Sequence, residues 1–112
     1  MFPEVSLHGY LMGSPALGTP EMTDQVRYFR RVAEPIPGPT THKLTELARR
    51  HHILLQVGMA ESAMSGNIIY NSAALIGPTG VIGVFRKLHN PFEWPVFSPG
   101  NHLSVFPTPL GP

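Results

Sequence analysis

Two charged residues of this sequence occupy positions from which a side chain could assist a reaction. Lys87 follows an apolar segment, and a cation placed where a buried strand opens into a loop is well sited to meet a reacting oxygen. Near the other end, Phe2-Pro3-Glu4 places a carboxylate beside a proline. The sequence contains no cysteine. Together these features suggest part of a hydrolytic enzyme whose nucleophile lies outside these 112 residues.

Each candidate also has a simpler interpretation. By composition, Glu4 fits a solvated residue near a terminus, and Lys87 fits a lysine that reaches water from the end of a strand. Glu93 fits an exposed residue in a loop between two prolines. Glu61 is expected to close a strand and pair locally, and Asn71 to hold a loop or strand backbone rather than touch a substrate. Residue type alone therefore leaves a catalytic and a structural role open.

Composition narrows the class of protein. A chain of 112 residues with 42% hydrophobic residues fits one domain with a core and argues against wholesale disorder. The net charge of +1 and the 13% of charged residues give no electrostatic footprint for nucleic acid. Without cysteine there is no disulfide framework, and the six histidines lack the paired spacing of a zinc site. Neither a membrane-spanning run nor a signal peptide is visible, so we expect a soluble cytoplasmic protein.

Helix and strand signals follow one another along the chain. Thr19-Pro20-Glu21 is a helix start, with a hydroxyl cap and a proline in the first turn, and Pro35 ends the pattern. A second helix is predicted from about Thr41 to His52. Its buried side is expected to carry Leu44, Leu47 and Ala48. Apolar strands are predicted at residues 53–60, over most of 68–76, and at 81–85. Residues 2–10 look like the tail of a strand that enters a loop.

The predicted strands are apolar on both faces, as in a sheet that is covered above and below. Two short helices cannot cover both faces of such a sheet. We therefore expect the chain to be incomplete as a folding unit, an α/β portion of a larger layered domain.

An ordered set of short motifs resembles the carbon–nitrogen hydrolase (nitrilase) superfamily. Single motifs are weak signals, but the ordered set is strong, and it covers nearly the whole chain, from Phe2 to about Gly111. The motifs are Phe2-Pro3-Glu4, Gly9-Tyr10, Pro37-Gly38-Pro39-Thr40, Leu47-Ala48, Val57-Gly58-Met59-Ala60-Glu61, Tyr70-Asn71-Ser72-Ala73, Pro78-x-Gly80 and Arg86-Lys87-Leu88-His89.

The resemblance implies a catalytic glutamate, lysine and cysteine. Glu4 matches the glutamate that acts as general base, and Lys87 matches the lysine. Glu93 resembles a second glutamate that in amidase-type members helps to position the substrate and the lysine. In such a site a thiol attacks the amide carbonyl and forms a thioester, the carboxylate carries the proton, and the ammonium faces the oxyanion. In the family the cysteine strand lies shortly after the point at which this sequence stops.

The resemblance also implies a fold and a substrate class. The parent fold is a four-layer α-β-β-α sandwich, of which residues 1–112 would be the central portion, without the opening strand and helix and without the cysteine strand. The expected reaction is hydrolysis of a non-peptide carbon–nitrogen bond in a small amide or carbamoyl compound. It needs no organic cofactor and no metal, and we expect the parent enzyme to be a homo-oligomer.

The loop after Lys87 lacks the Thr-x-x-Glu-Arg arrangement of true nitrilases, which favours an amidase over a nitrilase. The alternative from another class is a non-catalytic interaction module, or a degenerate relative that kept the scaffold. That alternative predicts that Glu4→Ala and Lys87→Ala are tolerated.

Overall fold

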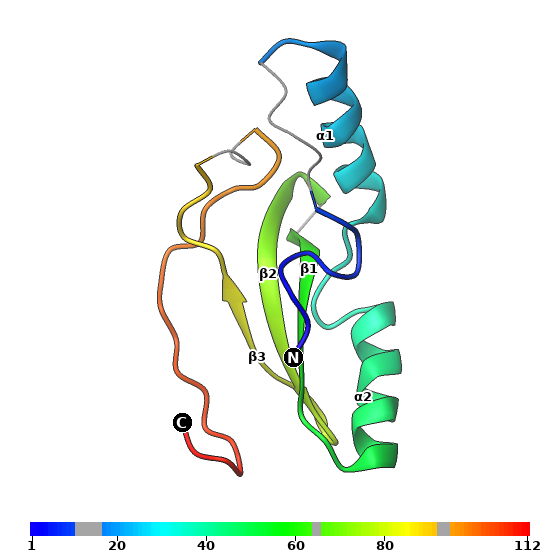
Figure 1. Cartoon of the computed structure of the whole chain (residues 1–112), viewed down its shortest axis with the longest axis vertical. Helices are drawn as coiled ribbons and strands as arrows, with labels where there is room; N and C mark the ends of the chain where they lie inside the picture. Colours follow the sequence, from blue (N-terminus) through cyan, green and yellow to red (C-terminus); the bar gives the residue numbers. More distant parts are fainter. Residues whose placement is uncertain (11–16, 64–65, 92–94) are drawn as a thin grey trace.

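The computed structural model describes residues 1–10, 17–63, 66–91 and 95–112. This part of the chain contains two helices and three strands (Figure 1). Their bounds are α1 Pro20–Val32, α2 Pro39–His51, β1 Leu55–Ala63, β2 Ile68–Gly77 and β3 Gly80–Arg86. The α/β class expected from the sequence is confirmed. Within these ranges no helix is long and apolar enough to cross a membrane.

Helix α1 begins and ends where the local sequence predicts. The Thr19 hydroxyl accepts a hydrogen bond from the Met22 amide (3.4 Å). Pro20 takes the first helical position, where its missing N–H leaves no partner unsatisfied. Met22 and Phe29 are buried, and the helix ends before Pro35 as expected. The buried pair places α1 against β1.

Helix α2 begins at Pro39 rather than at Thr41, because proline again suits the first helical position. It ends before His52, which takes a left-handed conformation with a φ of 52°. Ala48 is fully buried against the sheet, whereas Leu47 is 44% exposed. The prediction that Leu47 faces the core was wrong. Successive residues lie about 100° apart around a helix, and it is Ala48 that points at the sheet.

The three strands form one antiparallel sheet in the order β1-β2-β3. In its register Gly58 of β1 pairs with Ala73 of β2, and Ala60 pairs with Asn71. β1 begins later and ends later than predicted, at 55–63 rather than 53–60, whereas β2 and β3 match their predictions to within one residue at each end. The sheet thus confirms the three predicted strands.

A β-bulge decides which face of the sheet the second half of β3 presents. Val81 pairs with Ile76, but the next pair is Gly83 with Leu75, so Ile82 is the extra residue. Because side chains alternate along a strand, one inserted residue moves all later side chains to the opposite face. The bulge therefore also sets which face of the sheet the side chains at the end of β3 occupy.

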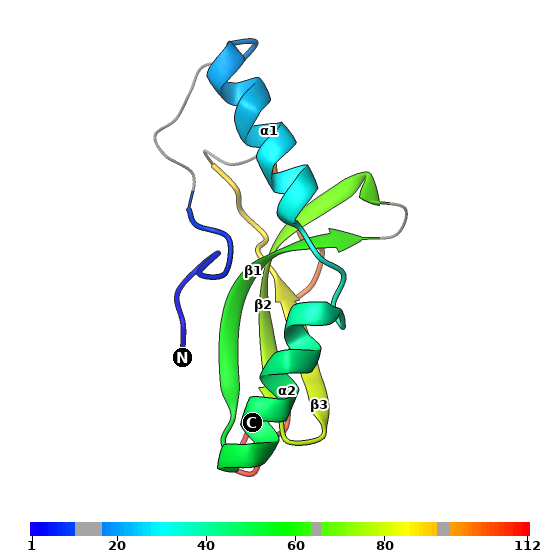
Figure 2. The same ribbon diagram turned by 90° about the vertical axis from the view of Figure 1, so that its right-hand side faces the viewer.

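Both helices lie on one side of the sheet and the C-terminal segment lies on the other (Figures 1 and 2). One apolar cluster joins α2 to the sheet and contains the buried residues Ala48, Ala74 and Ile76. A second cluster joins α1 and both terminal segments to the sheet and contains Val5, Met22, Phe29, Ala60, Ile69, Val96 and Phe97. These two clusters fix the helices and the terminal segments relative to the strands.

The N-terminal segment is not the strand tail that the sequence predicted for residues 2–10. Residues 4–8 form turns, and Val5 has a φ of 48°, in the left-handed region that an extended chain does not use. Phe2 still binds to the sheet, since its amide donates to the Gln56 carbonyl at 2.8 Å. The segment therefore lies beside β1 without adding a strand.

Candidate active site

A glycine in β1 lets the N-terminal segment approach the sheet. The Leu7 amide donates to the Gly58 carbonyl (3.3 Å), which ties the segment to the outer edge of β1. A Cβ at Gly58 would lie 2.3 Å from the Pro3 carbonyl oxygen and 2.8 Å from the Glu4 Cα, so only glycine allows this contact. Gly58 is thus a structural requirement for the position of Glu4.

Val5 anchors the turn that carries Glu4. Its side chain is 1% exposed and packs in the same cluster as Phe29 and Phe97. A left-handed φ on a β-branched residue costs about 1–3 kcal/mol, whereas full burial of a valine side chain returns about 1.5–3 kcal/mol. Burial of Val5 can therefore offset the strain of the turn and hold the preceding carboxylate at the edge of β1.

The backbone of Lys87 is held from two sides. Its amide donates to the Asn71 carbonyl of β2 and its carbonyl accepts from the Gly100 amide, both at 2.8 Å. Gly100 has no space for a side chain, because a Cβ there would lie 2.5 Å from the Arg86 carbonyl oxygen. The bulge at Ile82 sets the alternation of side chains that leads to Lys87. Strand register and the C-terminal segment together direct the lysine.

The Glu4 carboxylate and the Lys87 ammonium meet directly. Lys87 Nζ lies 2.6 Å from Glu4 Oε1, and the side-chain amide of Asn71 donates to the same oxygen. No hydrogen bond of Glu4 Oε2 to the described residues is present. The Lys87 side chain is 29% exposed and that of Glu4 is 40% exposed, so solvent screens the pair and its contribution to stability is about 1 kcal/mol or less. The pair therefore matters more for the relative position of the two charged groups than for the stability of the fold.

A cavity of about 240 Å³ opens at this pair. It is lined by Phe2, Pro3, Glu4, Gln56, Gly58, Asn71, Ser72, Ala73, Phe85 and Lys87. Much of the wall is apolar, and the charged groups gather at the contact between Glu4 and Lys87. Sites for small molecules have this pattern, in which an apolar concave surface carries a few polar groups that fix orientation.

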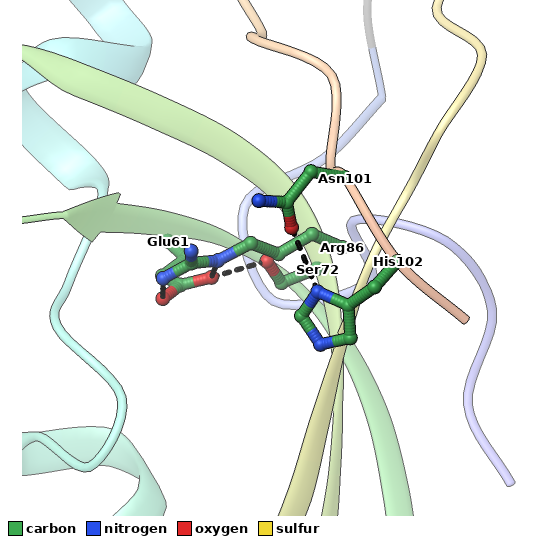
Figure 3. Close-up of polar contacts among 5 residues, drawn as sticks. All are labelled: Glu61, Ser72, Arg86, Asn101 and His102. Carbon is green, nitrogen blue, oxygen red and sulfur yellow. Dashed lines mark hydrogen bonds and ion pairs between the residues drawn. The ribbon is translucent and has the colours of Figure 1, made fainter. Parts of the chain in front are cut away.

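Arg86, one residue before Lys87, belongs to a second polar group (Figure 3). Its Nε and Nη2 donate to the two carboxylate oxygens of Glu61 at 2.9 and 2.6 Å, and the Ser72 hydroxyl donates to Glu61 Oε2 at 2.6 Å. The hydrogen bond to Glu61 raises the pKa of Arg86 above its ordinary value, against the opposing effect of burial. Its guanidinium also lies 4.1 Å from the centre of the Tyr70 ring.

The prediction for Glu61 was wrong in both parts. The residue lies inside β1, which continues to Ala63, and it pairs with Arg86 of β3 rather than with a local neighbour. The physical reason is burial. The Glu61 side chain is only 5% exposed, so its charge needs a fixed partner, which the sheet brings from two strands away.

The structure brings two of the three predicted site residues together. Glu4 and Lys87 meet although 83 positions separate them, and Glu93 lies outside the described residues. Asn71 was expected to hold backbone, and its carbonyl does bind the Lys87 amide, but its side chain also contacts Glu4. Sequence reasoning missed that contact. The available signal was an amide side chain in the middle of a mostly apolar strand, where burial would require a polar partner.

The chain belongs to the carbon–nitrogen hydrolase family, whose model matches residues 1–112. The resemblance to the nitrilase superfamily is therefore confirmed. Human omega-amidase NIT2 is 35% identical over 94 residues, which cover 74% of this chain and 34% of NIT2. An (R)-stereoselective amidase from a Pseudomonas species is 30% identical over 106 residues, which cover 94% of this chain and 33% of that amidase.

Solved structures of the same superfamily share the fold. Nit3 of Saccharomyces cerevisiae, a member of branch 10 of the nitrilase superfamily, matches with a TM-score of 0.63 and 29% identity over 78% of this chain and 33% of Nit3. A carbon–nitrogen hydrolase from Helicobacter pylori G27 matches with a TM-score of 0.52 and 25% identity over 74% of this chain and 27% of that protein. The chain spans about a third of the length of the curated relatives that it matches.

Proposed function

We propose that residues 1–112 supply the general base and the oxyanion-binding cation of an amidase that hydrolyses small amide or carbamoyl compounds. Glu4 is the base, Lys87 is the cation, and a cysteine from outside these residues is the nucleophile. The observation that carries this proposal is the 2.6 Å contact between Lys87 Nζ and Glu4 Oε1 at the cavity. The amidase names of several relatives favour the amide over the nitrile as substrate.

The proposed first step is attack of a thiol on the amide carbonyl. Glu4 removes the thiol proton, and the carbonyl oxygen becomes an oxyanion that the Lys87 ammonium faces. When the tetrahedral intermediate collapses, the carbon–nitrogen bond breaks and Glu4 returns its proton to the leaving amine. A thioester remains on the cysteine.

In the second step Glu4 takes a proton from water, which attacks the thioester and releases the acid and the thiol. The two carboxylate oxygens of Glu4 are suited to different tasks. Lys87 and Asn71 both contact Oε1, which fixes the direction of the carboxylate. Oε2 then remains as the oxygen that accepts and returns the proton.

The fragment hypothesis is part of this proposal. Residues 1–112 would be the central portion of an α-β-β-α domain, and the face of the sheet opposite the helices would be the face that meets the second sheet. Glu93 is proposed, from the family resemblance, to help position the substrate and Lys87.

The experiment that tests the proposal is a chimera in which residues 1–112 replace the matching region of the Pseudomonas (R)-stereoselective amidase, which would supply the rest of the domain. Ammonia release from small primary amides is the readout. Glu4→Gln and Lys87→Met should each lower kcat by about a hundredfold or more, because each removes a group that acts in the transition state. The matched controls are Glu46→Gln and Lys43→Met, which remove the same charges from the exposed side of α2.

Retained turnover in both Glu4→Gln and Lys87→Met would refute the assignment. A chimera that folds but releases no ammonia even with Glu4 and Lys87 in place would favour the alternative, a degenerate relative that keeps the scaffold without catalysis. The lack of cysteine is the observation on which that alternative rests.

A further inference from the structure

One hydrogen bond at the outer edge of β1 is made by an imidazole. An edge strand exposes alternate N–H and C=O groups that need partners. In β1 the Gly58 carbonyl accepts from the Leu7 amide, and the Ala60 carbonyl accepts from the Glu34 amide at 3.2 Å. The Ala60 amide instead donates to His8 Nδ1 at 3.0 Å. A titratable side chain thus takes the place of a backbone carbonyl.

His8 also connects this edge to helix α1. Its backbone carbonyl accepts a hydrogen bond from the Tyr28 hydroxyl. His8 lies four positions after Glu4, in a segment that binds β1 through the amides of Phe2 and Leu7. His8 is therefore the last attachment of the segment to the sheet before residues 9 and 10.

We propose that His8 is a positioning residue for Glu4 that works only in its neutral form, so that acid detaches the end of this segment from β1. The inference rests on the proposed role of Glu4 as the base. What is new is that a second, titratable residue of the segment controls how firmly the base is held.

The chemistry follows from which nitrogen carries the proton. To accept from the Ala60 amide, Nδ1 must be unprotonated, which requires the tautomer with hydrogen on Nε2. When the ring gains a second proton, Nδ1–H and the Ala60 N–H point at each other, and the bond is lost. The remaining contacts cannot replace it, because the Tyr28 hydroxyl binds the backbone of His8 and not its ring.

Two features of the surroundings of His8 shift its pKa in opposite directions. Burial lowers the pKa of its ring below the ordinary value of 6.5, and the nearby Glu34 carboxylate acts in the raising direction. Glu34 comes from the connection between the helices, where Thr40 donates to both of its carboxylate oxygens (2.9 and 2.7 Å). Helix α1 contributes the Tyr28 phenol, and β1 presents the amide of Ala60.

The sign of the pH effect follows from these contacts. Because the folded pKa is the lower one, the attachment is at full strength above the ordinary pKa of 6.5. It weakens as the pH falls from 6.5 through the lowered folded pKa, since only the detached segment takes up the proton readily. As the pH falls between these two values, the equilibrium for detachment should rise by at most about tenfold for each pH unit.

Hydrogen–deuterium exchange of the 112-residue chain tests the proposal at low protein concentration. The protection of the Ala60 amide is measured between pH 5 and 7.5, with intrinsic exchange rates corrected for pH. In the wild type, protection should fall as the pH falls below 6.5. His8→Asn, whose side-chain oxygen can accept the same hydrogen bond but does not titrate, should keep its protection at every pH. His8→Leu should lack it throughout.

Amides in the pairing of β2 with β3, such as that of Ala73, which lies opposite Phe85, report whether the sheet itself remains folded. If His8→Leu loses those as well, the comparison of wild type with His8→Asn still decides the matter. Equal protection of Ala60 in the wild type at pH 5 and pH 7.5 would overturn the proposal, as would the same pH dependence in His8→Asn. This readout needs no turnover, so a failure of the proposed amidase activity would be seen separately.

Discussion

Gly58→Ala is the substitution that most directly tests whether Gly58 allows the segment bearing Glu4 to lie against β1. A Cβ at position 58 would lie 2.3 Å from the Pro3 carbonyl oxygen, 2.6 Å from the Val5 amide nitrogen and 2.8 Å from the Glu4 Cα. All three are backbone atoms, so no side-chain rotation can relieve the contact. An ordinary carbon contact begins near about 3.5 Å, so the segment must move away from β1 by about 1 Å.

The magnitude follows from that displacement. Overpacking of this kind costs about 1–3 kcal/mol. A displacement of about 1 Å at the base is also expected to lower kcat by about a hundredfold, because the reacting groups lose their alignment. The bond from Leu7 to the Gly58 carbonyl, at 3.3 Å, should be the first to break.

The assay has a matched control in the same sheet. At Gly77 the nearest atom to an added Cβ is Ile82 Cδ1 at 3.0 Å, the end of a flexible side chain that can move. Gly77→Ala should therefore change the unfolding free energy by less than about 1 kcal/mol. Urea unfolding of the chimera, followed by circular dichroism, compares the two variants, and the same chimera gives kcat. If Gly58→Ala is as stable and as active as Gly77→Ala, the argument that Gly58 admits the segment bearing Glu4 is wrong.

Three further predictions concern stability, association and activity. Glu61→Ala should lower the unfolding free energy of the chimera by about 2 kcal/mol, because it leaves the buried Ser72 hydroxyl and Arg86 without their partner and the 35% exposure of Arg86 lets water recover part of that loss, whereas Glu46→Ala on the surface of α2 should cost less than about 1 kcal/mol; equal losses in urea unfolding would contradict the pairing of Glu61 with Arg86. The 112-residue chain should self-associate in light scattering, because large apolar residues such as Leu103 and Leu110 are 78% and 88% exposed; a monodisperse monomer that melts cooperatively would count against the fragment hypothesis. The chain alone should release no ammonia from amides, since a hydroxyl cannot simply replace the thiol, and turnover in a clean preparation would disprove the need for an external cysteine.

Local signals in the sequence predicted the elements well. The proline and hydroxyl at the start of α1 act within one turn, so they can be read without knowing the fold. The apolar runs of β2 and β3 were equally clear. The prediction for Leu47 was wrong because helical periodicity shows only which side of a helix is apolar. Which residues on that side meet the sheet depends on how α2 packs against it.

The site depended on information that no local pattern contains. Glu4 and Lys87 were paired through family resemblance, because their spacing in the sequence does not predict a contact. The contact depends on the bulge at Ile82, which directs the lysine, and on the turn at Val5, which directs the carboxylate. Asn71 was assigned to backbone because strand register was unknown. Once the register is known, its place opposite Ala60 and beside the amide of Lys87 follows.

The contact between Glu4 and Lys87 can be measured directly by carbodiimide coupling, which joins a carboxylate to an amine with loss of water and adds no spacer. The 112-residue chain is treated at low concentration, digested, and analysed by mass spectrometry, with Lys87→Arg as the variant that removes the amine. We expect an intramolecular amide bond between Glu4 and Lys87 as the main cross-link of Glu4, absent in Lys87→Arg. Coupling of Glu4 to Lys43 or to the N-terminal amine with none to Lys87, in folded monomer, would contradict a site in which these two side chains face each other.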